Sequence, residues 1–288
     1  MRLIRQKSDT EYVQGLERGF AIIKAFSVDV PAMTIAETAT RTNLPRAVAR
    51  RYLFTLEKLG YVRRDGALFA PTARLLDLGY RYLSTLPLTD LAQPHLEKVV
   101  ERLQQSSSVA VLDGLECVYV ARVPARRIIT TNLVVGSRVP AHATALGKVL
   151  LAYLPPEELD AYFSNAQAHL ERYTLRTICD QPQLRKALRD VRACGWACAD
   201  EEYNVGLRTI AAPIFDRSGR VKAAINIAGA VALVSMQEMR EDHLPVVLLA
   251  AREISRALGA RVDAIFEPAE PRPATAFGPA QARVAARR

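Results

Sequence analysis

The stretch from residue 34 to residue 59 constrains the fold most, because two helix starts stand close together in it. The first start is TIAE, in which the Thr34 hydroxyl can accept from the amide of Glu37 while the Glu37 carboxylate reaches back, forming a capping box. Asn43 then begins a tight link. Pro45 suits the first turn of the next helix, where a missing amide hydrogen costs nothing. Two helices joined so tightly predict a helix-turn-helix.

The segments on either side complete a winged helix-turn-helix. Upstream, residues 12–26 place apolar side chains at intervals of three and four, the stripe of an amphipathic helix. Downstream, Gly60 ends the second helix of the pair, and YVRRDGALFAP is typical of two strands joined by an Asp65-Gly66 turn. A basic hairpin directly after such a helix is typical of a wing. We therefore expect an all-α winged helix-turn-helix domain over residues 10–71.

The helix over residues 46–59 has one apolar and one basic face. At 100° per residue, one arc carries Val48, Ala49, Tyr52, Leu53, Leu56 and Leu59, and the opposite arc carries Arg46, Ala47, Arg50, Arg51, Phe54, Glu57 and Lys58. At the start of a recognition helix, long hydrogen-bond donors can reach base edges in the major groove and small residues allow close approach. Arginines on the wing can instead contact DNA phosphates. The alternative is a solvated basic face on a structural three-helix unit. The predicted DNA-contacting residues are Thr34, Arg46, Ala47, Arg50, Arg51, Arg63 and Arg64.

The distribution of charge supports a nucleic-acid partner for the first third of the chain. Residues 1–85 hold 14 lysines and arginines against 8 acidic residues, whereas residues 86–265 hold 21 against 20. The whole chain carries a net charge of +9. A basic domain joined to a nearly neutral one suggests that an anionic polymer meets the first and something else meets the second.

The rest of the chain predicts a connecting helix and a second domain. Residues 72–86 form an amphipathic pattern that we interpret as a linker helix, and a helix capped by Thr89 or Asp90 follows. From residue 107 short strands appear, over 107–114, 115–123 and 127–135. Helices over 145–154, 155–164 and 182–195, a hairpin over 207–230 and a long helix over 235–258 complete an α+β domain over 87–262, plausibly a small-molecule sensor. The Pro-, Ala- and Arg-rich tail over 263–288 is expected to be disordered.

The sequence offers little for catalysis or metal binding. No nucleophile elbow, metal-ligand set or phosphate loop accompanies the acidic run at residues 200–202, so we expect no enzyme activity, no metal and no cofactor. Cys194 and Cys198 have no nearby histidine or second cysteine pair, which favours small apolar fillers over a zinc site. No segment reaches the length of a membrane span, and the start lacks a signal peptide, so a soluble cytoplasmic protein is expected.

Four longer segments together resemble the isocitrate-lyase-regulator (IclR) family of bacterial transcription factors. These are VQGLERGFAIIKAF, LPRAVARRYLFTLEKLGYV, VPAHATALGKVLLAYL and GWACADEEYNVGLRTIAAPIFDRSGRVKAAINIAG, and the resemblance covers residues 12–260. The opening phrase and GLR are most similar to the Pca/Pob subgroup, which controls protocatechuate, 4-hydroxybenzoate and β-ketoadipate catabolism.

The resemblance implies a repressor or activator with a GAF-like effector domain that binds a small organic acid. It also implies a homodimer or homotetramer and a double-stranded DNA operator. Carried over by position, the effector pocket would be lined by Ile128, Thr131, Ala145, Leu146, Ala199, Leu207, Thr209, Asn226 and Ala228. Alanine at 145, 199 and 228 departs from members that bind very small keto acids, which favours a larger, partly apolar effector such as an aromatic or dicarboxylic acid.

Three groups of the second domain could hold a carboxylate. If Thr144 caps the helix over 145–154, the first amides of that helix can bind an anion. Arg208 could add a bidentate pair, or it could form a structural ion pair with Glu201 or Glu202. Thr209 and Asn226 could orient a hydroxyl or a second carboxylate. His142 is interpreted as structural. A sensor module without DNA readout, and a regulator of another small organic acid pathway, stay open as alternatives.

Overall fold

The computed structural model describes residues 12–83, 87–125, 133–166 and 170–262. The chain divides into two compact units, Met1–Thr85 and Leu86–Arg288. An all-α helix-turn-helix with a two-stranded wing forms the first unit, and an α+β fold forms the second, so the predicted fold class is confirmed. Within the described residues, no helix is long and apolar enough to cross a membrane.

The N-terminal unit contains the predicted helices and hairpin. Its elements are α1 (Gln14–Lys24), α2 (Ile35–Thr42), α3 (Arg46–Lys58), β1 (Val62–Asp65), β2 (Leu68–Pro71), a 3-10 turn (Ala73–Leu75) and α4 (Leu76–Leu83). The predicted capping box is present, because the Thr34 hydroxyl accepts from the amide of Glu37 and the Glu37 carboxylate accepts from the amide of Thr34. Asn43 closes α2 in the left-handed conformation at φ 52°, which allows the tight link into α3. The linker segment expected as one helix over 72–86 begins with this three-residue 3-10 turn, and α4 follows it from Leu76.

The core of the N-terminal unit lies between the helices and the wing. Its buried members are Ile22, Leu53, Leu56, Val62 and Phe69. Two helical-wheel assignments for α3 are wrong. Phe54, expected on the outer face, packs edge-to-face on Phe69 of the wing, with ring centroids 5.7 Å apart. Leu59, expected inward, is 51% exposed because it follows the last residue of α3 and caps it.

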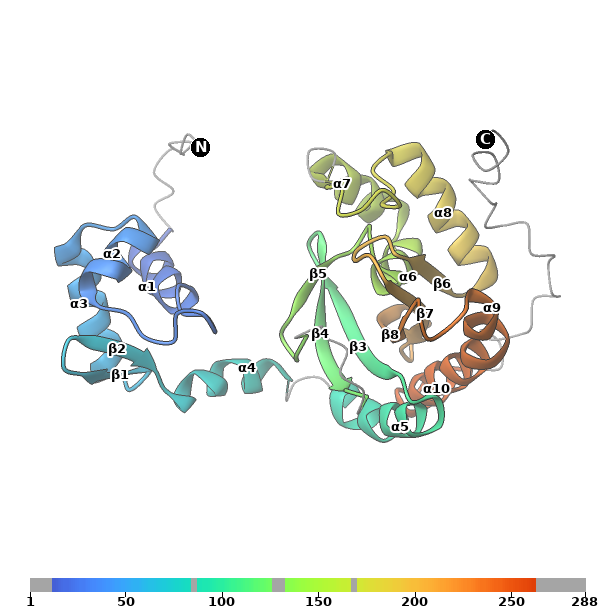
Figure 1. Ribbon diagram of the computed structural model, residues 1–288, viewed down its shortest axis with the longest axis horizontal. Coiled ribbons are helices and arrows are strands. Elements are labelled where there is room, and N and C mark those ends of the chain that lie inside the picture. Colours follow the sequence, from blue (N-terminus) through green and yellow to red (C-terminus); the bar gives the residue numbers. More distant parts are fainter. Residues whose placement is uncertain (1–11, 84–86, 126–132, 167–169, 263–288) are drawn as a thin grey trace. The chain divides into compact units, whose positions relative to one another are not determined.

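The C-terminal unit is built on one antiparallel sheet in the order β5-β4-β3-β8-β7-β6 (Figure 1). Hairpins join β3 to β4 and β7 to β8, and β3 pairs with β8 at the centre of the sheet. The strands are β3 (Ser106–Asp113), β4 (Glu116–Val123), β5 (Arg138–Pro140), β6 (Ala197–Asp200), β7 (Leu207–Phe215) and β8 (Val221–Ala230).

Helices cover both faces of this sheet (Figure 1). One face carries α5 (Pro87–Leu103) and α10 (Leu244–Ala257), which contact each other as well as the strands. The other face carries α6 (Ala145–Ala152), against which α8 (Gln181–Cys194) packs, and α7 (Pro156–Ala166) follows α6 in the chain. A short helix α9 (Met236–Glu238) and a π-helical turn (Met239–His243) precede α10.

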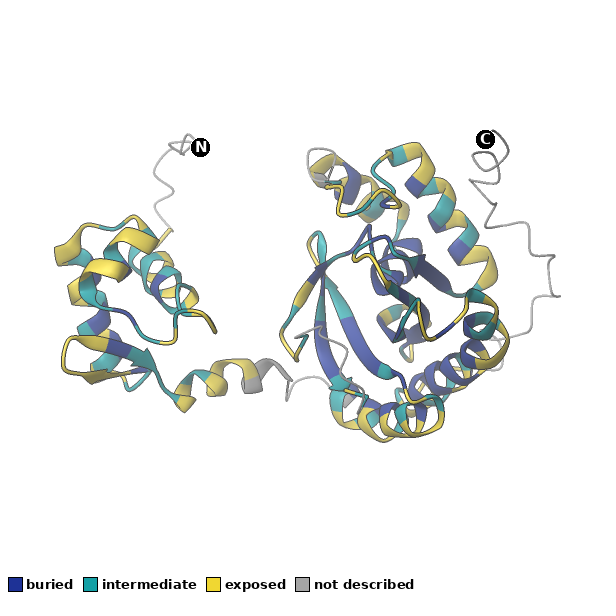
Figure 2. Ribbon diagram, viewed as in Figure 1, coloured by how far each residue is buried: buried dark blue, intermediate teal, exposed yellow. Residues whose placement is uncertain are grey.

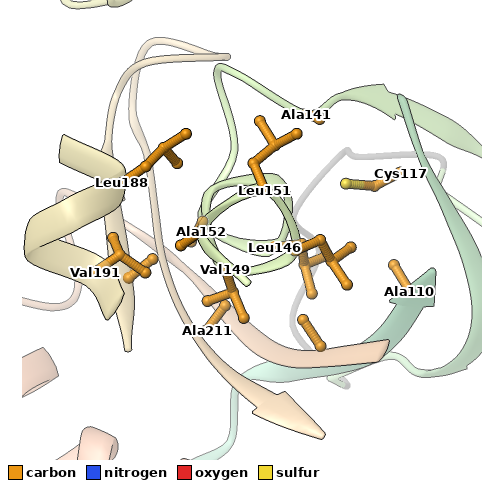
Figure 3. Close-up of a cluster of buried hydrophobic side chains, with 14 of the residues drawn as sticks. Ala110, Cys117, Ala141, Leu146, Val149, Leu151, Ala152, Leu188, Val191 and Ala211 are labelled. Atoms are coloured by element: carbon orange, nitrogen blue, oxygen red, sulfur yellow. The ribbon is translucent and has the colours of Figure 1, made fainter. Parts of the chain in front are cut away.

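Helix α6 is the centre of the second core. All eight of its residues are buried, including the small side chains at its start (Figure 2). Figure 3 shows α6 with Leu188 and Val191 of α8 on one side and with Ala110 and Cys117 of the sheet on the other. Apart from Lys148, α6 carries only small or apolar side chains, which explains its complete burial between a sheet and a second helix layer.

Three predicted elements differ from the structure. Most of the strand expected over 127–135 lies outside the described residues, and its described part, residues 133–135, is not a strand. The last helix is not continuous from residue 235 to residue 258, because the π-helical turn interrupts it. Helix α5 begins at Pro87, ahead of the expected cap at Thr89 or Asp90.

Candidate functional site

A pocket opens on the α6 face of the sheet, at the N-terminal end of α6. Its cavity volume is about 30 Å³, and the space between its side chains, including the part open to solvent, is about 520 Å³. Strands β4, β6, β7 and β8, the start of α6 and the loop after β6 form its walls. The lining residues are Tyr119, Arg122, Leu133, Val139, Ala143, Thr144, Leu146, Ala199, Glu202, Tyr203, Asn204, Leu207, Thr209, Asn226 and Ala228.

Strand register explains how small side chains form the floor of the pocket. Ala199 of β6 lies opposite Thr209 of β7, which in turn lies opposite Ala228 of β8. In the next row Asn226 of β8 lies opposite Ser108 of β3. Residues that are directly opposite in neighbouring strands point to the same face of a sheet. The floor therefore combines the small methyl groups of Ala199 and Ala228 with the polar side chains of Thr209 and Asn226.

A β-bulge turns Arg122 into this pocket. The register between β3 and β4 shifts at Val109 and Ala110, so that Tyr119 lies opposite Ala110 and Arg122 lies opposite Ser108. Simple alternation along β4 would place Tyr119 and Arg122 on opposite faces. The extra residue of the bulge reverses the alternation and brings both side chains to the pocket side.

Arg122 is a partly buried cation in an apolar setting. One guanidinium nitrogen donates to the Ser108 hydroxyl at 3.0 Å, which holds the side chain against the sheet. Burial lowers the pKa of Arg122 from its ordinary value, which nonetheless leaves a guanidinium charged at neutral pH. Among the residues that the structure describes, no carboxylate forms an ion pair with it. Arg122 therefore presents an uncompensated positive charge to the pocket.

The start of α6 adds a second attraction for anions. The Thr144 hydroxyl accepts from the amide of Gly147 at 3.2 Å, so Thr144 caps the helix as the sequence predicts. The first amides of a helix have no acceptor inside it, and the helix dipole is positive at this end. Ala143, Thr144 and Leu146 all line the pocket, which places these groups at its wall.

A buried ion pair flanks the pocket on the side of β6. The Lys148 ammonium of α6 contacts Oε1 of Glu202, and both side chains are almost fully buried. The Thr177 hydroxyl donates to the Glu202 carbonyl oxygen at 2.6 Å, which fixes the loop that carries the carboxylate. Burial raises the pKa of Glu202, while the neighbouring ammonium opposes that shift. Oε2 of Glu202 is buried and has no hydrogen-bond partner among the described residues.

Most of the predicted effector residues that the structure describes meet in this pocket. It is lined by Leu146, Ala199, Leu207, Thr209, Asn226 and Ala228. Ala145, the first residue of α6, does not line the pocket and is buried in the hydrophobic core that surrounds this helix. Ile128 and Thr131 lie outside the described residues.

Arg208 does not reach the pocket. It lies between two lining residues of β7, and successive side chains of a strand point to opposite faces. Its Nε donates to the Asp200 carboxylate at 2.8 Å, and another guanidinium nitrogen donates to the Val234 carbonyl at 2.6 Å. The geometry therefore fits the structural alternative, although the partner is Asp200 instead of Glu201 or Glu202. His142 is also held structurally, with Nε2 3.0 Å from the Glu171 carbonyl oxygen.

Sequence reasoning missed two charged side chains of the pocket, Arg122 and Glu202. The isolated arginine after the apolar run CVYVA was a usable signal, but its direction depends on the bulge. Glu202 was considered only as an ion-pair partner for Arg208, whereas the structure buries it beside Lys148.

The N-terminal unit presents a separate basic surface. Arg46, Ala47, Arg50 and Arg51 are all exposed on the first half of α3, and Arg63 and Arg64 are exposed on β1 of the wing (Figure 2). The guanidinium carbons of Arg50 and Arg64 lie 4.9 and 5.3 Å from the centre of the Phe54 ring. Such cation–π contacts restrict both side chains, and Nε of Arg64 also donates to the Gly66 carbonyl oxygen at 2.9 Å. The Thr34 hydroxyl is engaged in its capping box, so its DNA contact stays a prediction.

In the described part of the chain, no three His, Cys, Asp or Glu side chains are placed to hold a metal ion. Cys194 and Cys198 are free thiols. Burial raises the pKa of Cys198 to about 11, which keeps it protonated at neutral pH.

Comparison with known proteins links both surfaces to one family. Residues 15–66 match the model of the IclR helix-turn-helix domain, and residues 80–256 match that of the bacterial transcriptional regulator IclR C-terminal domain. The Pca regulon regulatory protein of Pseudomonas putida is 39% identical over 251 residues, which cover 87% of this chain and 86% of that protein. The p-hydroxybenzoate hydroxylase transcriptional activator of Acinetobacter baylyi is 34% identical, with 85% and 91% covered.

Solved structures agree with this assignment. A transcriptional regulator from Rhodococcus sp. RHA1 is 45% identical, with a TM-score of 0.78 over 86% of this chain and 98% of that one. An IclR homologue from Microbacterium hydrocarbonoxydans, solved in complex with 4-hydroxybenzoate, is 26% identical, with a TM-score of 0.75 over 85% and 98%. With both domain models matched in order, this chain belongs to the IclR family of bacterial transcriptional regulators.

Proposed function

We propose that this regulator controls an operon for the catabolism of aromatic acids or β-ketoadipate and responds to an acid bound in the pocket at the start of α6. The observation that carries the proposal is Arg122, a partly buried guanidinium without an ion-pair partner among the described residues, in a pocket lined mainly by apolar groups. A carboxylate bound there would gain a charge-assisted pair in a dry setting. The names of the Pseudomonas and Acinetobacter relatives, and the 4-hydroxybenzoate complex of the Microbacterium homologue, support the choice of ligand class.

The two units would divide this work. Residues 10–71 would bind the operator, residues 72–86 would transmit the signal, and residues 87–262 would bind the effector. Effector binding would favour one of two arrangements of a pair of winged helices, so that their spacing matches or misses the two half-sites. The pocket would bind its acid without converting it, and the protein would act in the cytoplasm, where the operator is.

A homodimer is the simplest assembly for such a readout. An apolar groove on the N-terminal unit is lined by side chains of α1, α3 and α4, among them Leu16, Phe20, Leu59 and Leu78, which are 43–63% exposed. Contiguous apolar surface of this kind commonly marks a protein interface. Sedimentation velocity of the full chain should give the mass of a dimer or of a dimer of dimers, and a monomer at micromolar concentration would contradict this assembly.

The direct test is an operator-binding titration in the presence of candidate acids. The full chain should bind its own promoter region in a gel-shift assay, and 4-hydroxybenzoate, protocatechuate or β-ketoadipate should change that affinity. A response to short keto acids alone would favour the alternative of another organic acid pathway. Absence of salt-dependent DNA binding would favour the sensor without DNA readout, and turnover of the bound acid would reveal an enzyme.

Arg50→Ala should weaken operator binding by about 1–3 kcal/mol, the usual contribution of a side chain that reads a base edge. Arg50 is exposed on the first half of α3, and its contact with the Phe54 ring limits the conformations it samples. The loss should be greater for the operator than for a scrambled duplex. Equal losses on both duplexes would remove Arg50 from base readout.

Arg63→Ala is the matched comparison, because Arg63 is equally exposed but lies on the wing. It should weaken binding to both duplexes alike. It should also reduce the slope of log affinity against log salt concentration by about one, the contribution of one phosphate contact. A loss confined to the operator would contradict the role assigned to the wing.

A further inference from the structure

Glu202 supplies the pocket with a hydrogen-bond acceptor that the protein leaves unused. Oε1 is occupied by the Lys148 ammonium, whereas Oε2 has no partner among the described residues although it is buried. Glu202 is only 9% exposed and lines the pocket. A buried acceptor without a donor is unfavourable, and a ligand that brings a donor would remove that cost.

The charges around the pocket point to one carboxylate and not two. Among the described lining residues, Arg122 and Glu202 are the charged groups, and Lys148 compensates Glu202. The net charge near the pocket is therefore one positive, which matches a monoanion. A second carboxylate placed near Oε2 would face a like charge in a poorly solvated site, which is unfavourable.

The remaining polar groups also favour a ligand that brings hydrogen-bond donors. Oδ1 of Asn226, which is 4% exposed, lines the same pocket and likewise has no partner among the described residues. Tyr119 at the wall has its pKa raised to about 12 by burial, so it is neutral and adds no charge.

We propose that Oε2 of Glu202 accepts a hydrogen bond from a hydroxyl group of the effector, so that the pocket selects hydroxylated aromatic monocarboxylic acids over dicarboxylic acids. Arg122 holds the carboxylate, and Glu202, positioned by Lys148, holds the hydroxyl. This inference rests on the proposed function, since it specifies the effector class for the same pocket.

The unmodified chain provides the first test, with three aromatic acids that differ only at the 4-position and with adipate as a dicarboxylic acid for comparison. Isothermal titration calorimetry of the full chain should give 4-hydroxybenzoate about tenfold or more tighter binding than benzoate, which lacks the hydroxyl. 4-Methoxybenzoate, whose ether oxygen cannot donate, should also bind about tenfold more weakly. Adipate should bind more weakly than 4-hydroxybenzoate by a similar factor. Equal affinity for 4-hydroxybenzoate and 4-methoxybenzoate, or tighter binding of adipate, would overturn the proposal.

The Glu202→Gln variant tests the residue itself. It should reduce the preference for 4-hydroxybenzoate over benzoate to about twofold or less and should tighten adipate binding, because a negative charge leaves the pocket. The matched control is Glu201→Gln, since Glu201 binds the Gly206 amide and Arg176 outside the pocket and should keep the wild-type preference. A Glu202→Gln protein that retains the full preference would refute the assignment.

Different results would overturn the role of Glu202 and the proposed function. Aromatic acids that bind and alter operator affinity without any hydroxyl preference would overturn the role of Glu202 and leave the proposed function standing. If no probe in the series binds, the proposed function fails and the inference falls with it.

Discussion

Replacing Gly147 by alanine should destabilise the C-terminal unit by about 3 kcal/mol or more, or prevent it from folding. Gly147 lies in the first turn of α6, where a Cβ atom would come within 2.0 Å of the Ala141 carbonyl oxygen and 2.2 Å of its Cα. Both contacts are with backbone, which cannot rotate away as a side chain can. Ala141 and α6 are packed within the same core, so neither can move without opening it (Figure 3).

Urea unfolding followed by circular dichroism would measure this loss. Gly79→Ala is the matched control, because Gly79 is also helical and a Cβ there meets nothing within 4 Å. That control should be neutral or slightly stabilising, since alanine favours a helix over glycine by about 1 kcal/mol. Unchanged unfolding of Gly147→Ala would contradict the close approach of α6 to residue 141.

Arg122→Gln should weaken effector binding by about 2–5 kcal/mol, the usual cost of removing one partner from a desolvated charge pair. The glutamine can still meet the Ser108 hydroxyl but cannot balance a carboxylate charge. Because no ion pair of Arg122 with a described residue is lost, the unliganded protein should melt at nearly the same temperature. Calorimetry with 4-hydroxybenzoate would measure the affinity. The affinity of Arg122→Lys should fall between that of the unmodified protein and that of Arg122→Gln.

Arg208→Gln provides the control for this prediction. It removes the ion pair with Asp200 and the bond to the Val234 carbonyl, so it should lower stability. Effector affinity should be unchanged, because the Arg208 guanidinium lies outside the pocket. Undiminished affinity in Arg122→Gln together with a loss in Arg208→Gln would reverse the two assignments.

Local signals explain why the N-terminal unit could be predicted in detail. A capping box, a tight link at Asn43 and a two-residue hairpin turn each depend on residues close together in sequence. The first two appear as predicted, whereas the turn is at Gly66 and Ala67, one residue later than predicted, because Asp65 still pairs with Leu68. Phe54 was misassigned because a helical wheel considers one helix alone and does not include the wing, whose Phe69 packs against Phe54.

The pocket depended on longer-range geometry. Its small floor residues were predicted from a family resemblance, whereas Arg122 and Arg208 could not be placed from pattern alone. A single bulge in β4 brings Arg122 inward, and plain alternation in β7 takes Arg208 outward. Which strand carries the bulge depends on pairing between β3 and β4, and no local residue pattern fixes that.

The shared contact of Arg50 and Arg64 with Phe54 has a consequence for how operator preference can change. A single aromatic ring braces one arginine of the recognition helix and one of the wing. Loss of the ring would release both arginines at once, so a substitution at Phe54 should not be additive with one at Arg50 or Arg64. New operator sequences would then be acquired more readily through Arg46 or Arg51 than through Arg50.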